Sequence, residues 1–374
     1  MIKLKRLIKQ EPVCCIALIL ALLSACIIKP DETYMTYPDY RTIILLFCLM
    51  IIVEGFSSLG VFSALAGKLL KKAKSVRSLA CIMILLCFFS SMLITNDVTL
   101  ITFVPFTILL FEIIQKPEAL LKVLVLETIA ANLGSMATPI GNPQNLYLYS
   151  IADFSITQFL FATLPYTILS LILLILSLLL IPNGHLGKLT TAEHMLTKDA
   201  WPKFGIYCIL LLLSLLVVFH ILPYSIVLII TLLAILFTDR SLYKNVDYFL
   251  LFTFLFFFIF IGNMKRIPAV NEVIRSLLNG QELIGGILVS QVISNVPAAI
   301  LLSGFTENLD RLLTGVNLGG LGTLIASLAS LITFKFYAKT ENGNKGLFLK
   351  IFTRYNFIFL IILTIYALLI WSFV

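Results

Sequence analysis

Two short polar runs interrupt apolar segments of this chain, and both carry side chains that can bind ions. Thr95, Asn96 and Asp97 follow one apolar stretch, and Ser294 and Asn295 follow another. Hydroxyl, amide and carboxylate oxygens are ligands for a hard cation such as sodium, which takes about five or six of them. An ionisable residue within an apolar segment, as Asp97 is, is a functional candidate by default. The two runs are therefore candidate ion sites.

Both runs belong to an internal repeat. Residues 91–98 (SMLITNDV) resemble residues 290–297 (SQVISNVP). Residues 131–140 (ANLGSMATPI) align without a gap with residues 316–325 (VNLGGLGTLI), in the same order along the chain. Interruptions at corresponding positions of two apolar halves are the best sequence pointer to a midplane site in a secondary transporter.

The composition is that of a polytopic membrane protein, so we expect the lipid bilayer to surround it. Hydrophobic residues make up 60% of the 374 residues and charged ones 12%, and the mean hydropathy is +1.05, which excludes a water-soluble domain of this size. The net charge of +8 lies in short clusters between apolar segments, where basic residues orient helices, so no nucleic-acid partner is expected. The cysteines form no CxxC pair and are expected to be buried apolar side chains.

The basic residues predict a multi-pass protein of the cell membrane with a cytoplasmic N-terminus. Residues 1–10 carry four basic side chains and precede the apolar run 13–28, which fits an uncleaved signal anchor. A cleaved signal peptide is the alternative, because residues 23–26 resemble a lipoprotein processing box. With the anchor retained, most basic clusters fall on the cytoplasmic side. Lys265, Arg266 and Arg275 are the exception, since they would lie outside.

The apolar segments predict an all-α protein of inverted repeats, with about nine spans plus two re-entrant hairpins. Each repeat has one hairpin and one broken transmembrane helix, and the two hairpins enter from opposite sides. Two full spans would also fit the first hairpin, but its tip carries the repeated polar motif, which favours the hairpin. The segment 204–219 is either a linker or the counterpart of the N-terminal anchor. The predicted parts are a first repeat at 1–182 with hairpin 78–114 and broken helix 120–149, a cytoplasmic linker at 183–203, and a second repeat at 204–374 with hairpin 284–305 and broken helix 312–337.

Interrupted helices leave backbone groups free, and these groups decide which ligands can bind. The N-termini of half-helices present amide donors that suit an anion, whereas unwound carbonyls suit a cation. Glycines allow a hairpin tip to approach the backbone of a broken helix closely. The candidates are Thr95, Asn96 and Asp97 with the backbone of 138–142 for a first sodium site, Ser294, Asn295 and Ser327 with the backbone from Gly319 and Gly320 to Thr323 for a second, weaker one, and Gly134 and Gly141 for close approach.

Enzymatic and ATP-driven chemistry have no support in the sequence. The chain contains no phosphate-binding loop, no nucleophile elbow and no HExxH motif. We therefore expect no enzymatic activity and no cofactor beyond a coupling ion, sodium or a proton.

These motifs resemble those of the ion transporter superfamily that contains the divalent anion:sodium symporters, the citrate transporters and the ArsB/NhaD-type permeases. Residues 131–145 (ANLGSMATPIGNPQN) are similar to the Gly-rich signature of that superfamily's first broken helix. Residues 95–99 (TNDVT) and 294–297 (SNVP) are similar to the hairpin tips of the ArsB/NhaD branch. The resemblance covers most of the chain, residues 42–374, but its sharp motifs occupy only the hairpins and broken helices.

The resemblance implies roles for individual residues. Asn96 and Asn295 would coordinate the coupling ion at the two tips, assisted by Thr95 and Ser294. Residues 326–330 (ASLAS) replace the proline-containing segment of the symporters, so a second sodium site like theirs is not implied. Elevator movement against a scaffold and a homodimer are implied by analogy. Other residues that fall in the matching motifs are Thr99 at the first tip and Gly134, Thr138, Gly141, Asn142 and Asn145, which would line the first ion and substrate site.

The sequence thus favours a secondary active transporter of a small anion, a carboxylate or an oxyanion, coupled to a sodium or proton gradient. A sodium/proton antiporter is the alternative, in which Asp97 alternately binds a proton and sodium. Arsenite efflux with a separate ATPase partner is a third possibility, although no cysteine lies at a tip. A non-transporting membrane component would have no need of helices broken at midplane.

Overall fold

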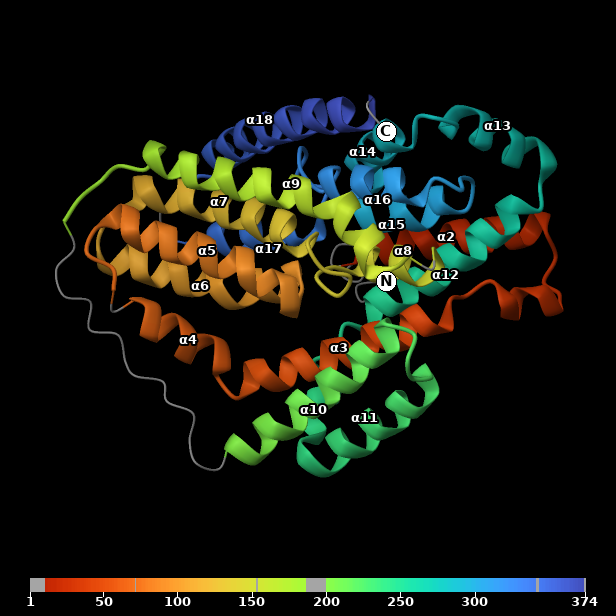
Figure 1. Ribbon diagram of the computed structural model, residues 1–374, viewed down its shortest axis with the longest axis horizontal. Helices are drawn as coiled ribbons and strands as arrows, with labels where there is room; N and C mark the ends of the chain where they lie inside the picture. The colour runs from red at the N-terminus through yellow and green to blue at the C-terminus, as the bar shows by residue number, and fades with distance from the viewer. Residues whose placement is uncertain (1–10, 71, 153, 186–199, 341–342, 373–374) are drawn as a thin grey trace, which may run out of the picture.

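The computed structural model describes residues 11–70, 72–152, 154–185, 200–340 and 343–372. Within these ranges the chain is helical, and its only β pairing is an isolated bridge between Ser75 and His185. Most of the helices lie side by side along the long axis of the molecule (Figure 1). The predicted all-α class is confirmed, while most of the predicted linker, 183–203, lies outside the described residues.

The first half contains two helices joined by a single residue, followed by a helix that breaks and resumes. Its elements are α2 (Pro12–Ile27), η1 (Glu32–Thr36), α3 (Tyr40–Ser58), α4 (Val61–Leu70), the hairpin α5 (Val76–Ile94) and α6 (Asn96–Ile113), the broken helix α7 (Pro117–Ser135) and α8 (Pro143–Ile151), and α9 (Ile156–Ser177) with η2 (Leu178–Leu180).

The second half repeats this order with one additional helix at its start. Its elements are α10 (Ala200–Val218), α11 (Tyr224–Thr238), η3 (Arg240–Lys244), α12 (Tyr248–Lys265), α13 (Pro268–Leu278), the hairpin α14 (Glu282–Ile293) and α15 (Asn295–Ser303), the broken helix α16 (Leu309–Leu318) and α17 (Leu328–Tyr337), and α18 (Lys345–Ser372).

Helix packing shows how the halves correspond. α5 and α6 pack on α7, as α14 and α15 pack on α16. Between the halves, α6 packs on α17 and α15 packs on α8, so each hairpin contacts the far half-helix of the other repeat. The helices outside the hairpins and broken helices, which we call the scaffold, also pack on helices of the other half: α2 packs on α12, and α11 packs on α3. α10 also packs on α3, so both α10 and α11 meet the packing criterion for a counterpart of α2.

The two hairpins point toward each other along the molecule. In Figure 1, α5 and α6 lie toward the left end of the molecule, and α14 and α15 lie to the right of them. α5 and α6 are each about 28 Å long at 1.5 Å per residue, long enough for two spans by length alone. Their tip nevertheless lies inside the protein. The N–H of Asn96 donates to the carbonyl of Gly141 in the broken-helix loop, and α8 continues beyond that loop. The predicted pair of opposed hairpins is confirmed.

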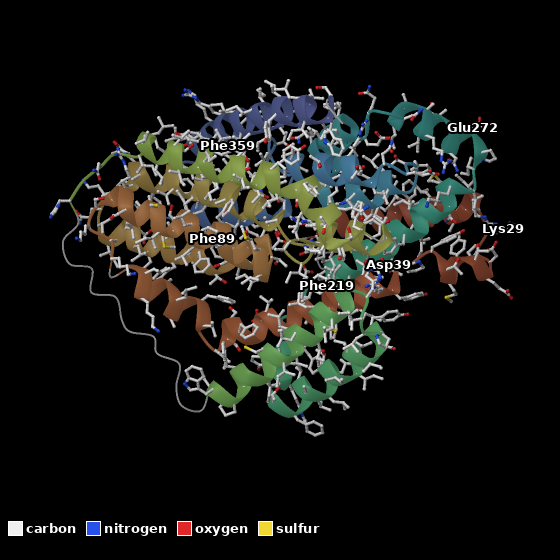
Figure 2. The ribbon with its side chains drawn as sticks, in the orientation of Figure 1. Lys29, Asp39, Phe89, Phe219, Glu272 and Phe359 are labelled. Carbon is white, nitrogen blue, oxygen red and sulfur yellow. The ribbon has the colours of Figure 1, made fainter. Side chains whose placement is uncertain are left out.

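The outer faces of the helices are apolar, as a lipid environment requires. Seven of the described helices are long and apolar enough to cross a membrane. Phe89 on α5, labelled in Figure 2, is 52% exposed. Lys29 and Glu272 lie at one end of the molecule, beside the α2–η1 connection and on α13. The chain is a multi-pass membrane protein.

The basic cluster that departs from the positive-inside preference has an acidic partner. Arg266 lies 2.8 Å from the carboxylate of Asp31 and also donates to the hydroxyl oxygens of Thr33 and Tyr37. The Thr33 hydroxyl, followed by Arg266, lowers the pKa of Asp31 below its ordinary value. One of the three basic residues is therefore neutralised locally, which weakens its effect on helix orientation.

Candidate functional site

Each hairpin turns at one residue with a left-handed backbone. Thr95 has φ 69° and ψ 155°, and Ser294 has φ 76° and ψ 154°. Positive φ is unfavourable for residues with a side chain, especially for β-branched threonine, and costs on the order of 1 to 3 kcal/mol. Two such turns at corresponding positions indicate that the tip geometry is maintained by its surroundings.

The residue after each turn is bound to a broken helix. The backbone N–H of Asn96 donates to the carbonyl of Gly141 at 3.2 Å, and that of Asn295 donates to the carbonyl of Ala326 at 2.9 Å. Gly141 and Ala326 occupy corresponding positions when the gapless alignment is extended by one residue. Both tips therefore lie against broken-helix loops, and we call this region, with loops 136–142 and 319–327, the tip junction.

Small residues allow the close approach. A Cβ on Gly134 would lie 2.2 Å from the carbonyl oxygen of Phe88, and one on Gly319 would lie 2.7 Å from Oγ of Ser290. The two glycines correspond in the repeat. At each of these positions the broken helix and the hairpin are too close to admit a larger residue without movement.

Threonine hydroxyls make a second matched contact. Thr138 Oγ1 donates to the carbonyl of Met92, and Thr323 Oγ1 donates to the carbonyl of Gln291 at 3.2 Å. These pairs also correspond in the repeat. The structure thus places predicted residues from both repeats in equivalent positions around the tip junction.

Asn132 is a hub that joins the two repeats. Its Oδ1 accepts a hydrogen bond at 3.0 Å from Nδ2 of Asn96 and another at 3.0 Å from Oγ of Ser327. Its Nδ2 faces the carbonyl of Gly320 at 3.5 Å. A Cβ on Gly320 would lie 2.8 Å from Nδ2 of Asn295, so the hub extends from the first tip to the second.

Asn317, the counterpart of Asn132, forms the equivalent hub. Its Oδ1 accepts from Nδ2 of Asn142 at 3.1 Å, and its Nδ2 donates to Oδ1 of Asn145 at 2.6 Å. Asn142 and Ser327 also correspond when the alignment is extended, so each broken-helix loop donates to the hub of the other repeat. Both asparagines are buried, as are the polar side chains that contact them.

Asn132 and Asn317 were absent from the predicted site. The signal was present, because both stand in the repeated Asn-Leu-Gly segment. Of the predicted residues, Thr99 is buried on α6 and its hydroxyl has no partner among the described residues. The amide of Asn145 faces loop backbone, and the backbone N–H of Thr323 donates to Oε1 of Gln291 on α14.

A cavity of about 150 Å³ lies beside the first tip, and we call it the acidic cavity. Thr95, Asp97 and Asn142 line it from the tip junction. Glu54 on α3 and Asp247 at the start of α12 line it from the scaffold, and no basic side chain occurs among its described lining residues. The carboxylates are spread around the cavity. Among the described residues, no group of three acidic, histidine or cysteine side chains is close enough to hold one metal ion together.

The polar groups of the acidic cavity differ in what they bind. Glu54 accepts a hydrogen bond from Nδ2 of Asn245 at 2.8 Å, and Asp247 caps α12 by accepting from the N–H of Leu250 at 3.0 Å. No described residue donates a hydrogen bond to the carboxylate of Asp97, which is only partly buried and faces the cavity. Asp97 is therefore the carboxylate whose oxygens are available to an ion.

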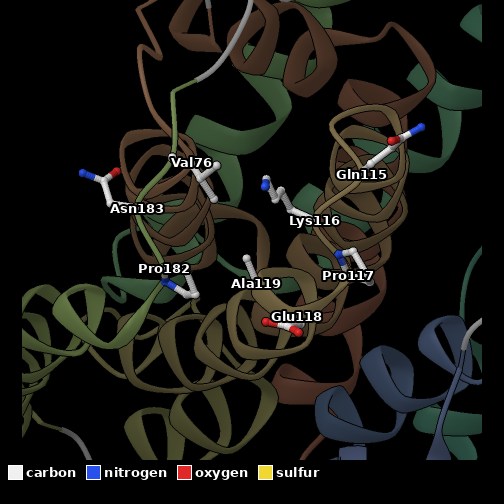
Figure 3. A pocket seen from close by; sticks show the side chains of 9 residues that line it. Val76, Gln115, Lys116, Pro117, Glu118, Ala119, Pro182 and Asn183 are labelled. Carbon is white, nitrogen blue, oxygen red and sulfur yellow. The ribbon is translucent and has the colours of Figure 1, made fainter.

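Another cavity lies at the opposite end of the first hairpin. It has a volume of about 330 Å³ and lies between the start of α5, Lys116 in the α6–α7 connection with Glu118 at the start of α7, and the segment after η2 (Figure 3). None of its lining residues comes from a hairpin tip or a broken-helix loop. It is separate from the candidate site.

Replacing Asn132 by alanine should reduce both stability and transport. The change leaves the Nδ2 donor of Asn96 and the hydroxyl of Ser327 without their acceptor, which costs about 1 to 3 kcal/mol for each buried group. Asn356→Ala is the control, because that buried amide donates only within its own helix, to Phe352. Melting temperature and transport rate would be measured together. Equal effects of the two substitutions would contradict the role of Asn132 as a hub.

Comparison with known proteins agrees with this architecture. Residues 9–313 match the family model described as "Citrate transporter". The chain is 36% identical over 360 residues to "Uncharacterized transporter MJ0456" of Methanocaldococcus jannaschii, an alignment that covers 95% of this chain and 96% of that protein.

Two further relatives are similar over smaller shares. "Inner membrane protein YbiR" of Escherichia coli strain K12 is 32% identical over 79% of this chain and 80% of its own length. "Silicon efflux transporter LSI3" of Oryza sativa subsp. japonica is 32% identical over 37% of this chain and 28% of its own length. The predicted resemblance is confirmed: the chain is a membrane transporter and belongs to the citrate transporter family.

Proposed function

We propose that this protein is a secondary active transporter of a small anion, a carboxylate or an oxyanion, coupled to a sodium or proton gradient. The observation that carries this proposal is the convergence of four half-helix N-termini, those of α6, α8, α15 and α17, at the tip junction. Helix N-termini present amide donors and partial positive charge, which favour an anion. Membership of the citrate transporter family supports the same substrate class.

The coupling ion would bind at the acidic cavity. Asp97 is the second residue of α6, so a cation on its carboxylate lies next to the hairpin tip that would hold the anion. A bound cation offsets the negative charge of Asp97 and makes the approach of an anion more favourable. Binding of the two would therefore be coupled through the first tip.

Alternating access would use the boundary that the acidic cavity marks. Asp97 and Asn142 belong to the hairpin and broken-helix bundle, whereas Glu54 and Asp247 belong to the scaffold of α3 and α12. Elevator movement of the bundle would open or close this cavity because its two walls lie on different parts of the protein. The N-terminus would remain cytoplasmic, as the basic residues indicate.

A sodium/proton antiporter is the second candidate. The acidic lining favours it, because carboxylates without a described basic neighbour attract cations and repel anions. In that case Asp97 would exchange sodium and a proton, and the tip junction would hold no anion.

Transport by the purified protein in proteoliposomes distinguishes the two candidates. Labelled succinate and citrate uptake would be followed under an imposed sodium or proton gradient, together with the quenching of an internal pH dye. Anion uptake that depends on one of the gradients is the expected result. Sodium-driven proton movement without anion uptake would replace the anion transporter by the antiporter, and the absence of both would reject both.

A further inference from the structure

In each broken helix, carbonyl groups at the interruption meet at one side-chain amide. In the first repeat, Nδ2 of Asn145 donates to the carbonyls of Ser135, Met136 and Thr138 at 3.3, 3.2 and 3.0 Å. We call these three oxygens the first carbonyl cage. They belong to the end of α7 and the loop after it, where the helix no longer supplies donors.

The second repeat contains an equivalent arrangement. Nε2 of Gln291 donates to the loop carbonyls of Gly319 and Leu321, both at 2.9 Å, and to that of Ile287, one turn earlier in its own helix, at 3.2 Å. We call these oxygens the second carbonyl cage. Gly322 has φ 101°, and a Cβ there would lie 2.3 Å from Oε1 of Gln291, so the loop is shaped around this amide.

The surrounding donors fix which end of each amide faces its cage. Oε1 of Gln291 accepts from the backbone N–H of Thr323 at 2.9 Å, and Oδ1 of Asn145 accepts from Nδ2 of Asn317 at 2.6 Å. If either amide were reversed, its oxygen would face three carbonyl oxygens and its nitrogen would face a donor. The nitrogen therefore occupies the cage in both repeats.

The two amides are not counterparts in the repeat. Gln291 corresponds to Met92, and Asn145 corresponds to Ser330. One amide comes from a hairpin and the other from a half-helix, yet both place an NH2 group among loop carbonyls. Two unrelated positions thus meet the same requirement, which is a positive partner for clustered carbonyl oxygens in a buried loop.

Clustered carbonyl oxygens can be satisfied by a donor or by a hard cation. We propose that the side-chain amides of Gln291 and Asn145 take the place of a metal ion in the two carbonyl cages, so that the loops are closed without sodium. The second cage is then a latent site for a monovalent cation, blocked by Gln291. The proposal rests on the proposed function only in one consequence: exchange of the coupling ion is left to Asp97.

The test is the salt dependence of thermal unfolding in detergent, with Asp97→Asn as the background to remove the acidic cavity's own response. In that background, the melting temperature should be the same in sodium chloride and choline chloride. Adding Gln291→Ala should lower it in choline chloride, because the two loop carbonyls lose their donor, and sodium should then raise it by about 2 to 4 °C.

Two further variants serve as controls. Met92→Ala changes the corresponding position of the first hairpin, whose side chain has no donor, and should show no sodium effect. Gln291→Met fills the space without a donor and should be destabilised without recovery in sodium. If Gln291→Ala does not fold, Gln291→Ser tests the same cage with a smaller loss of packing.

Two results would overturn the proposal. A sodium-specific rise in melting temperature with Gln291 and Asn145 in place would mean that the loops bind sodium beside the amides. A Gln291→Ala or Gln291→Ser protein without a sodium-specific rise would mean that the second cage is not a latent cation site. Neither result depends on transport, so this proposal and the proposed function can fail separately.

Discussion

Asp97→Asn is expected to lower ion-coupled transport by about 100-fold while leaving the protein folded. The amide has nearly the same shape as the carboxylate, but it cannot carry the negative charge that attracts a cation, and it cannot take up a proton at physiological pH. A loss of this size corresponds to the upper part of the usual range of coupling between two bound ligands. The measurement is gradient-driven uptake in proteoliposomes, with melting temperature as the check on folding.

Glu112→Gln is the matched control for this change. Glu112 lies on the same helix, α6, but at its other end, where it is exposed and outside the acidic cavity. It should transport as the unmodified protein does. If Asp97→Asn retains gradient-driven uptake, coupling does not pass through Asp97, and the coupling ion must bind elsewhere in the tip junction.

Gly134→Ala should destabilise the protein more than Gly319→Ala does. The new Cβ would lie 2.2 Å from the carbonyl oxygen of Phe88, a backbone atom of the neighbouring hairpin helix, so α5 and α7 must separate. Overpacking of this kind costs about 1 to 3 kcal/mol and occasionally more. Gly319→Ala should cost less, because its nearest neighbour is the hydroxyl of Ser290, a side-chain group.

Gly205→Ala is the control for the effect of alanine itself. Gly205 lies within α10 and a Cβ there would meet nothing within 4 Å, so the substitution should stabilise the helix by roughly 0.5 to 1 kcal/mol. Melting temperature and the fraction of monodisperse protein after extraction would be measured for all three variants. A Gly134→Ala protein as stable as Gly205→Ala would mean that α5 and α7 are less closely held than described.

The hairpins and broken helices could be predicted because their polar residues interrupt apolar runs and occur twice. The apolar run of residues 42–66 indicates a single span, whereas the structure divides it into α3 and α4, since Gly60 has φ 73° between them. The hubs at Asn132 and Asn317 were harder to recognise, because their partners lie in the opposite repeat.

Other parts of the site depend on contacts that no local pattern contains. Glu54 and Asp247 reach the acidic cavity from helices far apart in the chain. The amide of Gln291 donates to two loop carbonyls, and neither the spacing nor the composition of the sequence indicates this contact. Contacts between side chains of the two repeats can be identified only once the packing of the repeats is known.

The exchange of partners between the repeats has a consequence for biosynthesis. Ser327 donates to Asn132, and Asn142 donates to Asn317, so neither hub is complete within its own half of the chain. When the first repeat enters the bilayer during translation, Asn132 and Asn142 have only their partners in the first half, Asn96 and Ser135. Their other partners lie 195 and 175 residues downstream. Buried polar groups without partners are costly in lipid. Insertion of the first half therefore yields an intermediate with incomplete hydrogen bonding at both hubs. Water or the insertion machinery must contact these polar groups until the second half is inserted.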